Sequence, residues 1–122
     1  FGGILTNIIE KFRSGKYSKE DLCYSLQETV FAMLVEIAER ALAATGKEEL
    51  LLGGGVSCNT RLQEMCRVMC EDRSAKLFVP ENQFLVDNGA MIAWLGILEF
   101  LKGKKIAAEK AVVRPYWRTD ED

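Results

Sequence analysis

The chain has 122 residues, 48% of them hydrophobic and 28% charged, which are ordinary values for one globular domain. Its 16 basic and 18 acidic side chains give a formal net charge of −2, so the charge balance shows no signature of nucleic-acid or anionic-membrane binding. No segment approaches the roughly 20 apolar residues of a membrane span, and no secretory signal pattern is present. RNA binding would therefore depend on a basic patch elsewhere in the molecule.

The four cysteines bear on metal binding and on the cellular compartment. Cys23, Cys58, Cys66 and Cys70 form no CxxC pair, and the chain contains no histidine, so a structural zinc site would need all four thiolates. We favour reduced, mostly buried thiols, which are typical of a cytosolic or nuclear protein. The zinc site is the alternative.

Two helices are predicted in the first part of the chain. Apolar residues at helical spacing predict a short amphipathic helix over 4–13. Ser18 is a suitable N-cap for a long helix that continues to Thr45 and ends at Gly46. This second helix is apolar nearly all round over 30–37, which predicts packing on more than one side.

Strands and helices alternate in the remainder. A short apolar run predicts a buried strand, and Thr60 with Gln63 resembles a capping box that would start the next helix. The predicted elements are a strand at 50–52, a helix at 60–73, a strand at 76–79, a helix at 88–101 and an irregular tail at 104–122.

The fold class that follows is α/β, with the order α-α-β-α-β-α and a short parallel sheet. Because two strands make a poor sheet, we expect the chain to be part of a larger lobe. Trp94 and Phe100 on the last helix are interpreted as core residues. The basic side chains are interpreted as solvated, namely Arg61, Arg67, Arg73, Lys102, Lys104 and Lys105.

A glycine run and an asparagine stand where the first strand gives way to a helix. Gly53–Gly55 permits positive φ and a close approach of a ligand to the backbone, although the run matches neither GxGxxG nor a Walker A loop. The two interpretations are a tight turn without a ligand and a nucleotide or phosphate site. Asn59 is either a helix cap or a group that binds a ribose or carbonyl.

A second junction precedes the last helix. Asp87-Asn88-Gly89 resembles a hairpin turn, but the helix-forming residues that follow argue against a strand. Asp87 is then either an N-cap or an oxygen ligand for a metal completed by groups from elsewhere. The two junctions together predict one binding face built from two loops.

These motifs resemble the tRNA threonylcarbamoyl-adenosine synthase family, formerly called O-sialoglycoprotein endopeptidase, in its archaeal and eukaryotic branch. The family lies within the actin/hexokinase/Hsp70-like ATPase superfamily (ASKHA fold). The matching segments occur in order along the chain: Phe1-Gly2-Gly3-Ile4-Leu5-Thr6, Tyr24-Ser25-Leu26-Gln27-Glu28-Thr29, Gly54-Gly55-Val56-Ser57-Cys58-Asn59, Asp87 to Ala93, and Arg118-Thr119-Asp120-Glu121.

The resemblance implies transfer of a threonylcarbamoyl group from threonylcarbamoyl-AMP to N6 of adenosine 37 in tRNAs that decode ANN codons. It implies that Gly54, Gly55 and Asn59 hold the nucleotide, ATP or the adenylate, and that Asp87 binds an iron- or zinc-type divalent metal. The implied partners are tRNA and the KEOPS subunits, a small kinase/ATPase and a dimerising subunit. No membrane partner is implied, and the implied location is cytoplasmic and nuclear.

The resemblance also implies that residues 1–122 are part of a C-terminal lobe. The family's other metal ligands form an HxxxH motif in the N-terminal lobe, and this chain has no histidine. We therefore expect the N-terminal lobe and the first strands of this lobe to be absent and the chain alone to be inactive. The alternatives are a sugar- or acyl-kinase-like member of the superfamily and a non-catalytic interaction fragment.

Overall fold

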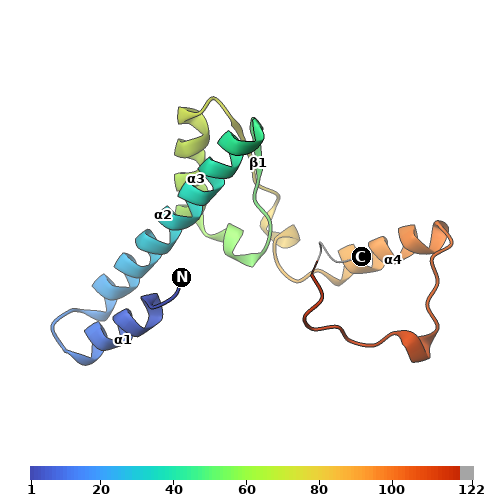
Figure 1. The fold of residues 1–122 in the computed structure, drawn as a ribbon, viewed down its shortest axis with the longest axis horizontal. Coiled ribbons are helices and arrows are strands. Elements are labelled where there is room, and N and C mark those ends of the chain that lie inside the picture. Colours follow the sequence, from blue (N-terminus) through green and yellow to red (C-terminus); the bar gives the residue numbers. More distant parts are fainter. Residues whose placement is uncertain (119–122) are drawn as a thin grey trace. The chain divides into compact units, whose positions relative to one another are not determined.

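The computed structural model describes residues 1–118 and shows a mixed α/β fold (Figure 1). In chain order the elements are α1 (Ile4–Arg13), α2 (Lys19–Thr45), β1 (Glu49–Leu51), the 3-10 turn η1 (Gly55–Cys58), α3 (Thr60–Asp72), β2 (Lys76–Phe78), the 3-10 turn η2 (Asn82–Phe84), α4 (Gly89–Leu101) and the 3-10 turn η3 (Ala108–Lys110). The predicted α/β class with a short parallel sheet is confirmed. The 3-10 turns were not predicted.

The chain divides into two compact units, the first ending at Asp87 and the second beginning at Asn88. The first unit contains α1 to α3 and both strands, and the second contains α4. No helix in residues 1–118 is both long enough and apolar enough to cross a membrane.

The ends of α1 and α2 follow from local chemistry. The Ser18 hydroxyl accepts a hydrogen bond from the Asp21 N–H at 3.0 Å, which satisfies one of the free donors at the start of α2. At the other end Gly46 has φ 62°, and its N–H donates to the Leu42 carbonyl. Both predicted helices are confirmed at these bounds.

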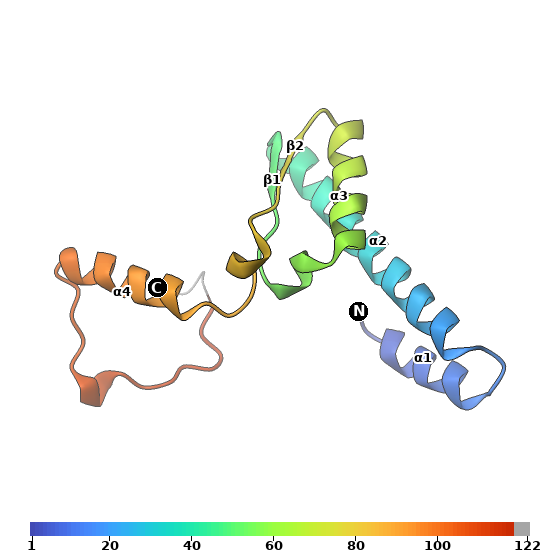
Figure 2. The same ribbon diagram turned by 180° about the vertical axis from the view of Figure 1, so that it is seen from behind.

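The sheet is a parallel pair in which Leu50 lies opposite Leu77 and Leu51 opposite Phe78 (Figure 2). Leu50 and Leu77 face α2 and α3, where they pack on a core of Phe31, Leu42, Leu62, Cys66, Met69 and Cys70. Leu51, which points to the other face, is 69% exposed. The prediction of a buried first strand is therefore correct for one face only, because α2 and α3 cover a single side of the sheet in the described residues.

Within residues 88–118 the second unit has no buried apolar side chain. Trp94 is 60% exposed and Phe100 is 59% exposed, so the prediction that they are core residues is wrong. Every residue of α4 except Glu99 is exposed. An apolar helix of this kind needs a surface to pack on, and none is present within residues 88–118. After α4, η3 is the only regular element through residue 118; residues 119–122 of the predicted tail lie outside the described part.

All four thiols are free, as predicted. Cys66 and Cys70 are buried, Cys58 is half-buried and Cys23 is exposed. Burial raises the pKa of the Cys66 and Cys70 thiols, with the neighbouring Cys70 adding to the effect at Cys66. Their role is to fill the core between α3 and the sheet.

The core under α3 yields a stability prediction. Leu62 is 6% exposed and packs against Phe31 and Cys66, so Leu62→Ala should lower the free energy of unfolding by about 2–5 kcal/mol. Val68→Ala on the same helix is the control, since Val68 is 53% exposed and its replacement should change stability by about 0.5 kcal/mol or less. Chemical denaturation measures both. Equal losses of unfolding free energy for Leu62→Ala and Val68→Ala would contradict the placement of Leu62 in the core.

Candidate nucleotide site

The loop that follows β1 has one position that requires glycine. Gly54 has φ 88° and ψ 164°, a backbone conformation that side-chain-bearing residues rarely adopt. Gly53 and Gly55 have ordinary φ values, and a Cβ at Gly55 would lie 4.0 Å from the Leu85 carbonyl oxygen, an ordinary contact. The conformation of the loop therefore depends on Gly54. Gly53 and Gly55, on either side, have no side chain that would cover the backbone.

Ser57, which the sequence analysis did not single out, fixes the shape of this loop. Its side chain is 5% exposed, and its hydroxyl donates to the Gly53 carbonyl at 2.9 Å. The Gln63 amide in turn donates to the Ser57 carbonyl at 2.7 Å. Within residues 1–118 the N–H groups of residues 53–56 have no hydrogen-bond acceptor, so they form a row of free donors. Such a row favours an anion.

Asn59 is the N-cap of α3. Its Oδ1 accepts from the N–H of Arg61 at 2.9 Å and from the N–H of Leu62 at 3.3 Å. The predicted capping box of Thr60 and Gln63 is therefore wrong, because the stronger capping residue stands one position earlier and Gln63 reaches Ser57 instead. The cap interpretation of Asn59 is confirmed, and it leaves the nitrogen of the amide for other contacts.

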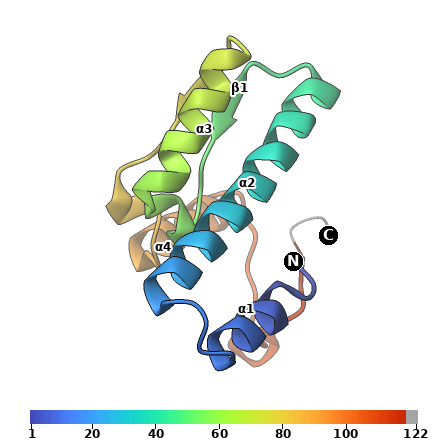
Figure 3. The ribbon, with the colours of Figure 1, turned by 90° about the vertical axis from the view of Figure 1, so that its left-hand side faces the viewer.

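Two hydrogen-bonded pairs join the start of α3 to α2, which runs beside it (Figure 3). The Asn59 Nδ2 donates to Gln27 Oε1 at 3.1 Å. Arg61 donates from Nε and Nη2 to the two oxygens of Glu28 at 2.9 and 2.8 Å. A bidentate pair of this kind fixes direction as well as distance.

The prediction that the basic residues are solvated is therefore wrong for Arg61. It is half-buried and also pairs with Glu64 at 2.7 Å. The hydrogen bonds that Arg61 donates, followed by its charge, lower the pKa of the Glu28 carboxyl. The same hydrogen bonds, donated to Glu28 and Glu64, raise the pKa of Arg61. Arg73 also pairs with α2, through Glu39 at 3.1 Å.

Asp87 is exposed and precedes α4 without capping it. The cap is Asn88, whose Oδ1 accepts from the Met91 N–H at 3.2 Å, so the cap interpretation of Asp87 is wrong. The Asp87 carboxylate has no hydrogen bond or ion pair within residues 1–118. No three Cys, Asp or Glu side chains in those residues are grouped as metal ligands. Asp87 therefore belongs to no group of three such side chains within residues 1–118.

The segment that leads to Asp87 lies against the glycine loop. Cys58 Sγ is 3.9 Å from the Asn82 carbonyl oxygen, and the Leu85 carbonyl lies beside Gly55. Leu85 itself is 4% exposed and anchors this contact. The structure thus brings residues 82 and 85, which precede Asp87 in the chain, against the glycine loop.

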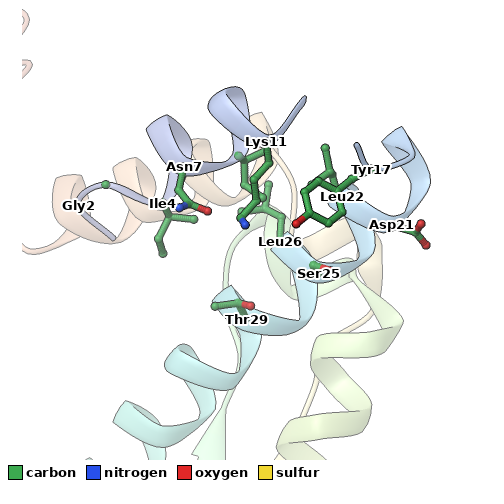
Figure 4. A pocket seen from close by; sticks show the side chains of 12 residues that line it. Gly2, Ile4, Asn7, Lys11, Tyr17, Asp21, Leu22, Ser25, Leu26 and Thr29 are labelled. Carbon is green, nitrogen blue, oxygen red and sulfur yellow. The ribbon is translucent and has the colours of Figure 1, made fainter. Parts of the chain in front are cut away.

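A separate open pocket of about 450 Å³ lies between α1 and α2 (Figure 4). It contains none of the predicted site residues. Its polar side chains are mostly exposed, and the ammonium of Lys11 lies 5.2 Å from the centroid of the Tyr17 ring. With no buried polar group facing it, this pocket has few features of a specific site.

Comparison with known proteins identifies the family. The family model described as tRNA N6-adenosine threonylcarbamoyltransferase (TsaD) matches residues 1–94. The chain belongs to this family. The matched range includes Gly54, Gly55, Asn59 and Asp87. The family predicted from the sequence motifs is therefore confirmed.

Relatives within the family agree with this assignment. A tRNA N6-adenosine threonylcarbamoyltransferase from Thermococcus kodakarensis is 53% identical over 99% of this chain and 37% of its own length. A probable bifunctional tRNA threonylcarbamoyladenosine biosynthesis protein from Methanosarcina mazei is 55% identical over 99% of the chain and 22% of its own length. A tRNA N6-adenosine threonylcarbamoyltransferase from Methanocella arvoryzae is 54% identical over 91% of the chain and 34% of its own length. The chain thus spans 37% or less of these family members.

The pair formed by Glu28 and Arg61 predicts a pH dependence of stability. The pKa of Glu28 is lowered from its ordinary value of 4.5 in the folded chain, so the pair stabilises the fold above pH 4.5. This stabilisation should be lost as the pH falls below 4.5 and the carboxylate is protonated. The free energy of unfolding, measured between pH 3 and 7, should therefore fall less steeply with decreasing pH for Glu28→Gln than for the unaltered chain.

Arg61→Met provides the matching variant, since it removes the other partner of the ion pair. It should also make the free energy of unfolding depend less on pH below pH 4.5. Identical pH profiles for the unaltered chain and both variants would contradict the role given to this pair.

Proposed function

We propose that the full-length protein containing this chain transfers the threonylcarbamoyl group of threonylcarbamoyl-AMP to N6 of adenosine 37 in ANN-decoding tRNAs. The observation that carries the proposal is the family match, because its range contains the glycine loop, Asn59 and Asp87 together. The contacts of Asn82 and Leu85, which precede Asp87, with the glycine loop support it further.

The nucleotide part of the adenylate is assigned to the loop after β1. The free N–H groups of residues 53–56 favour phosphate oxygens, and Gly54 and Gly55 carry no side chain that would keep a ligand from the backbone. Asn59 stands at the N-terminus of α3, where the helix dipole adds favourable positive potential. Together these groups hold the leaving adenylate while the acyl group is transferred.

The metal is assigned to Asp87. An exposed carboxylate without a competing partner fits an iron- or zinc-type divalent ion as one of several ligands. When bound, the ion supplies Lewis-acid polarisation of the carbamoyl carbonyl. The remaining ligands are proposed to come from the HxxxH motif of the family's N-terminal lobe, since this chain has no histidine.

The chain alone is proposed to be inactive as a partial C-terminal lobe of the ASKHA fold. Within residues 1–118 no three His, Cys, Asp or Glu side chains are grouped as metal ligands, and Leu51 on β1 and the apolar side chains of α4 are exposed. The proposed partners of the full-length protein are tRNA and the KEOPS kinase/ATPase and dimerising subunits, and the proposed location is cytoplasmic and nuclear.

The metal role of Asp87 is tested in the full-length protein. Asp87→Ala removes an oxygen ligand, so metal affinity should fall by more than about tenfold and threonylcarbamoyl-adenosine in tRNA should disappear. Elemental analysis of the purified protein and nucleoside mass spectrometry measure the two effects. Asp72→Ala, which removes another exposed carboxylate of the first unit, should leave both unchanged. Normal levels of the modified nucleoside with Asp87→Ala would sink the assignment.

A further inference from the structure

Most hydrogen-bonding positions of the Asn59 side-chain amide are already occupied, which limits how this amide can bind a ligand. An asparagine oxygen has two lone pairs, and here they accept from the N–H groups of Arg61 and Leu62. One of the two N–H donors on Nδ2 is used by Gln27 Oε1 at 3.1 Å. One N–H therefore remains, so a ligand of Asn59 must present an acceptor atom.

We propose that Gln27 on α2 is a positioning residue of the nucleotide site. By accepting from Nδ2, it fixes the plane of the Asn59 amide and directs the remaining N–H to an acceptor oxygen of the adenylate. This inference rests on the proposed function of Asn59, and it adds a residue from a different helix, 32 positions earlier in the chain.

The packing around Gln27 holds α2 in place, so the hydrogen bond between Gln27 and Asn59 has a fixed geometry. Gln27 is half-buried, and Phe31, one turn further on the same face of α2, is 7% exposed in the core against Leu62. The adjacent Glu28 holds Arg61 by two hydrogen bonds. Two consecutive residues of α2 thus hold the cap and the first turn of α3, which limits movement of Asn59 relative to the core.

A merely structural role for Gln27 makes a different prediction from a positioning role. If Gln27 only joins α2 to α3, its loss lowers stability and reduces nucleotide affinity to the same extent whether or not Asn59 can donate. If it acts through the Asn59 amide, its loss has no further effect on affinity once that donor is gone. A double-mutant cycle separates these cases.

The test uses the full-length protein with AMP as the probe and calorimetry as the measurement. Asn59→Ser keeps an N-cap oxygen and removes the donor, while Gln27→Met keeps the length of the side chain and removes the acceptor. Each should weaken AMP binding by about tenfold, which corresponds to 1.4 kcal/mol. The double variant should bind AMP no more weakly than Asn59→Ser alone.

Gln63→Met is the matched control, because Gln63 is also a half-buried glutamine, but its side-chain amide donates to the Ser57 carbonyl and makes no hydrogen bond to the Asn59 side chain. Its effect on AMP affinity should add to that of Asn59→Ser. Affinity losses that add for Gln27→Met and Asn59→Ser, or unchanged affinity with Gln27→Met alone, would overturn the inference. Unchanged affinity with Asn59→Ser would instead overturn the proposed role of Asn59 itself.

Discussion

The attachment of the first turn of α3 to the middle of α2 is the interaction on which the rest of the first unit depends. Gln27 and Glu28 hold Asn59 and Arg61 across 32 and 33 positions of sequence. A parallel strand pair three residues long provides little stability by itself, so its position is set by the helices that cover it. The polar pairs fix the direction in which α3 leaves the glycine loop, and the core around Phe31 fixes its distance from α2.

The loop after β1 is held in shape by two further hydrogen bonds. The Ser57 hydroxyl donates to the Gly53 carbonyl and the Gln63 amide to the Ser57 carbonyl, while the N–H groups of residues 53–56 have no acceptor within residues 1–118. The chain from η2 to Asp87 packs against the same loop. The proposal that a nucleotide and a metal are held side by side requires the loop and Asp87 to be neighbours, and the contacts of Asn82 and Leu85 with the loop support it.

Local sequence signals predicted the helix ends but not the long-range contacts. Ser18 and Gly46 define α2 through atoms within a few residues, so both were predictable. The sequence does not reveal the ion pair of Arg61, because its partner Glu28 is distant in sequence. The exposure of Trp94 is not predictable from its hydrophobicity, which indicates a tendency to be buried but does not supply the surface that covers the side chain. The family was predictable because its motifs are short, contiguous and in order.

The most direct test of the account is amide hydrogen exchange of the full-length protein with and without AMP. The account predicts that nucleotide slows exchange in residues 53–62, where the free N–H groups and the Asn59 cap lie, and leaves residues 4–17 of the pocket between α1 and α2 unchanged. Protection confined to residues 4–17, with none in residues 53–62, would contradict the assignment of the nucleotide to the glycine loop.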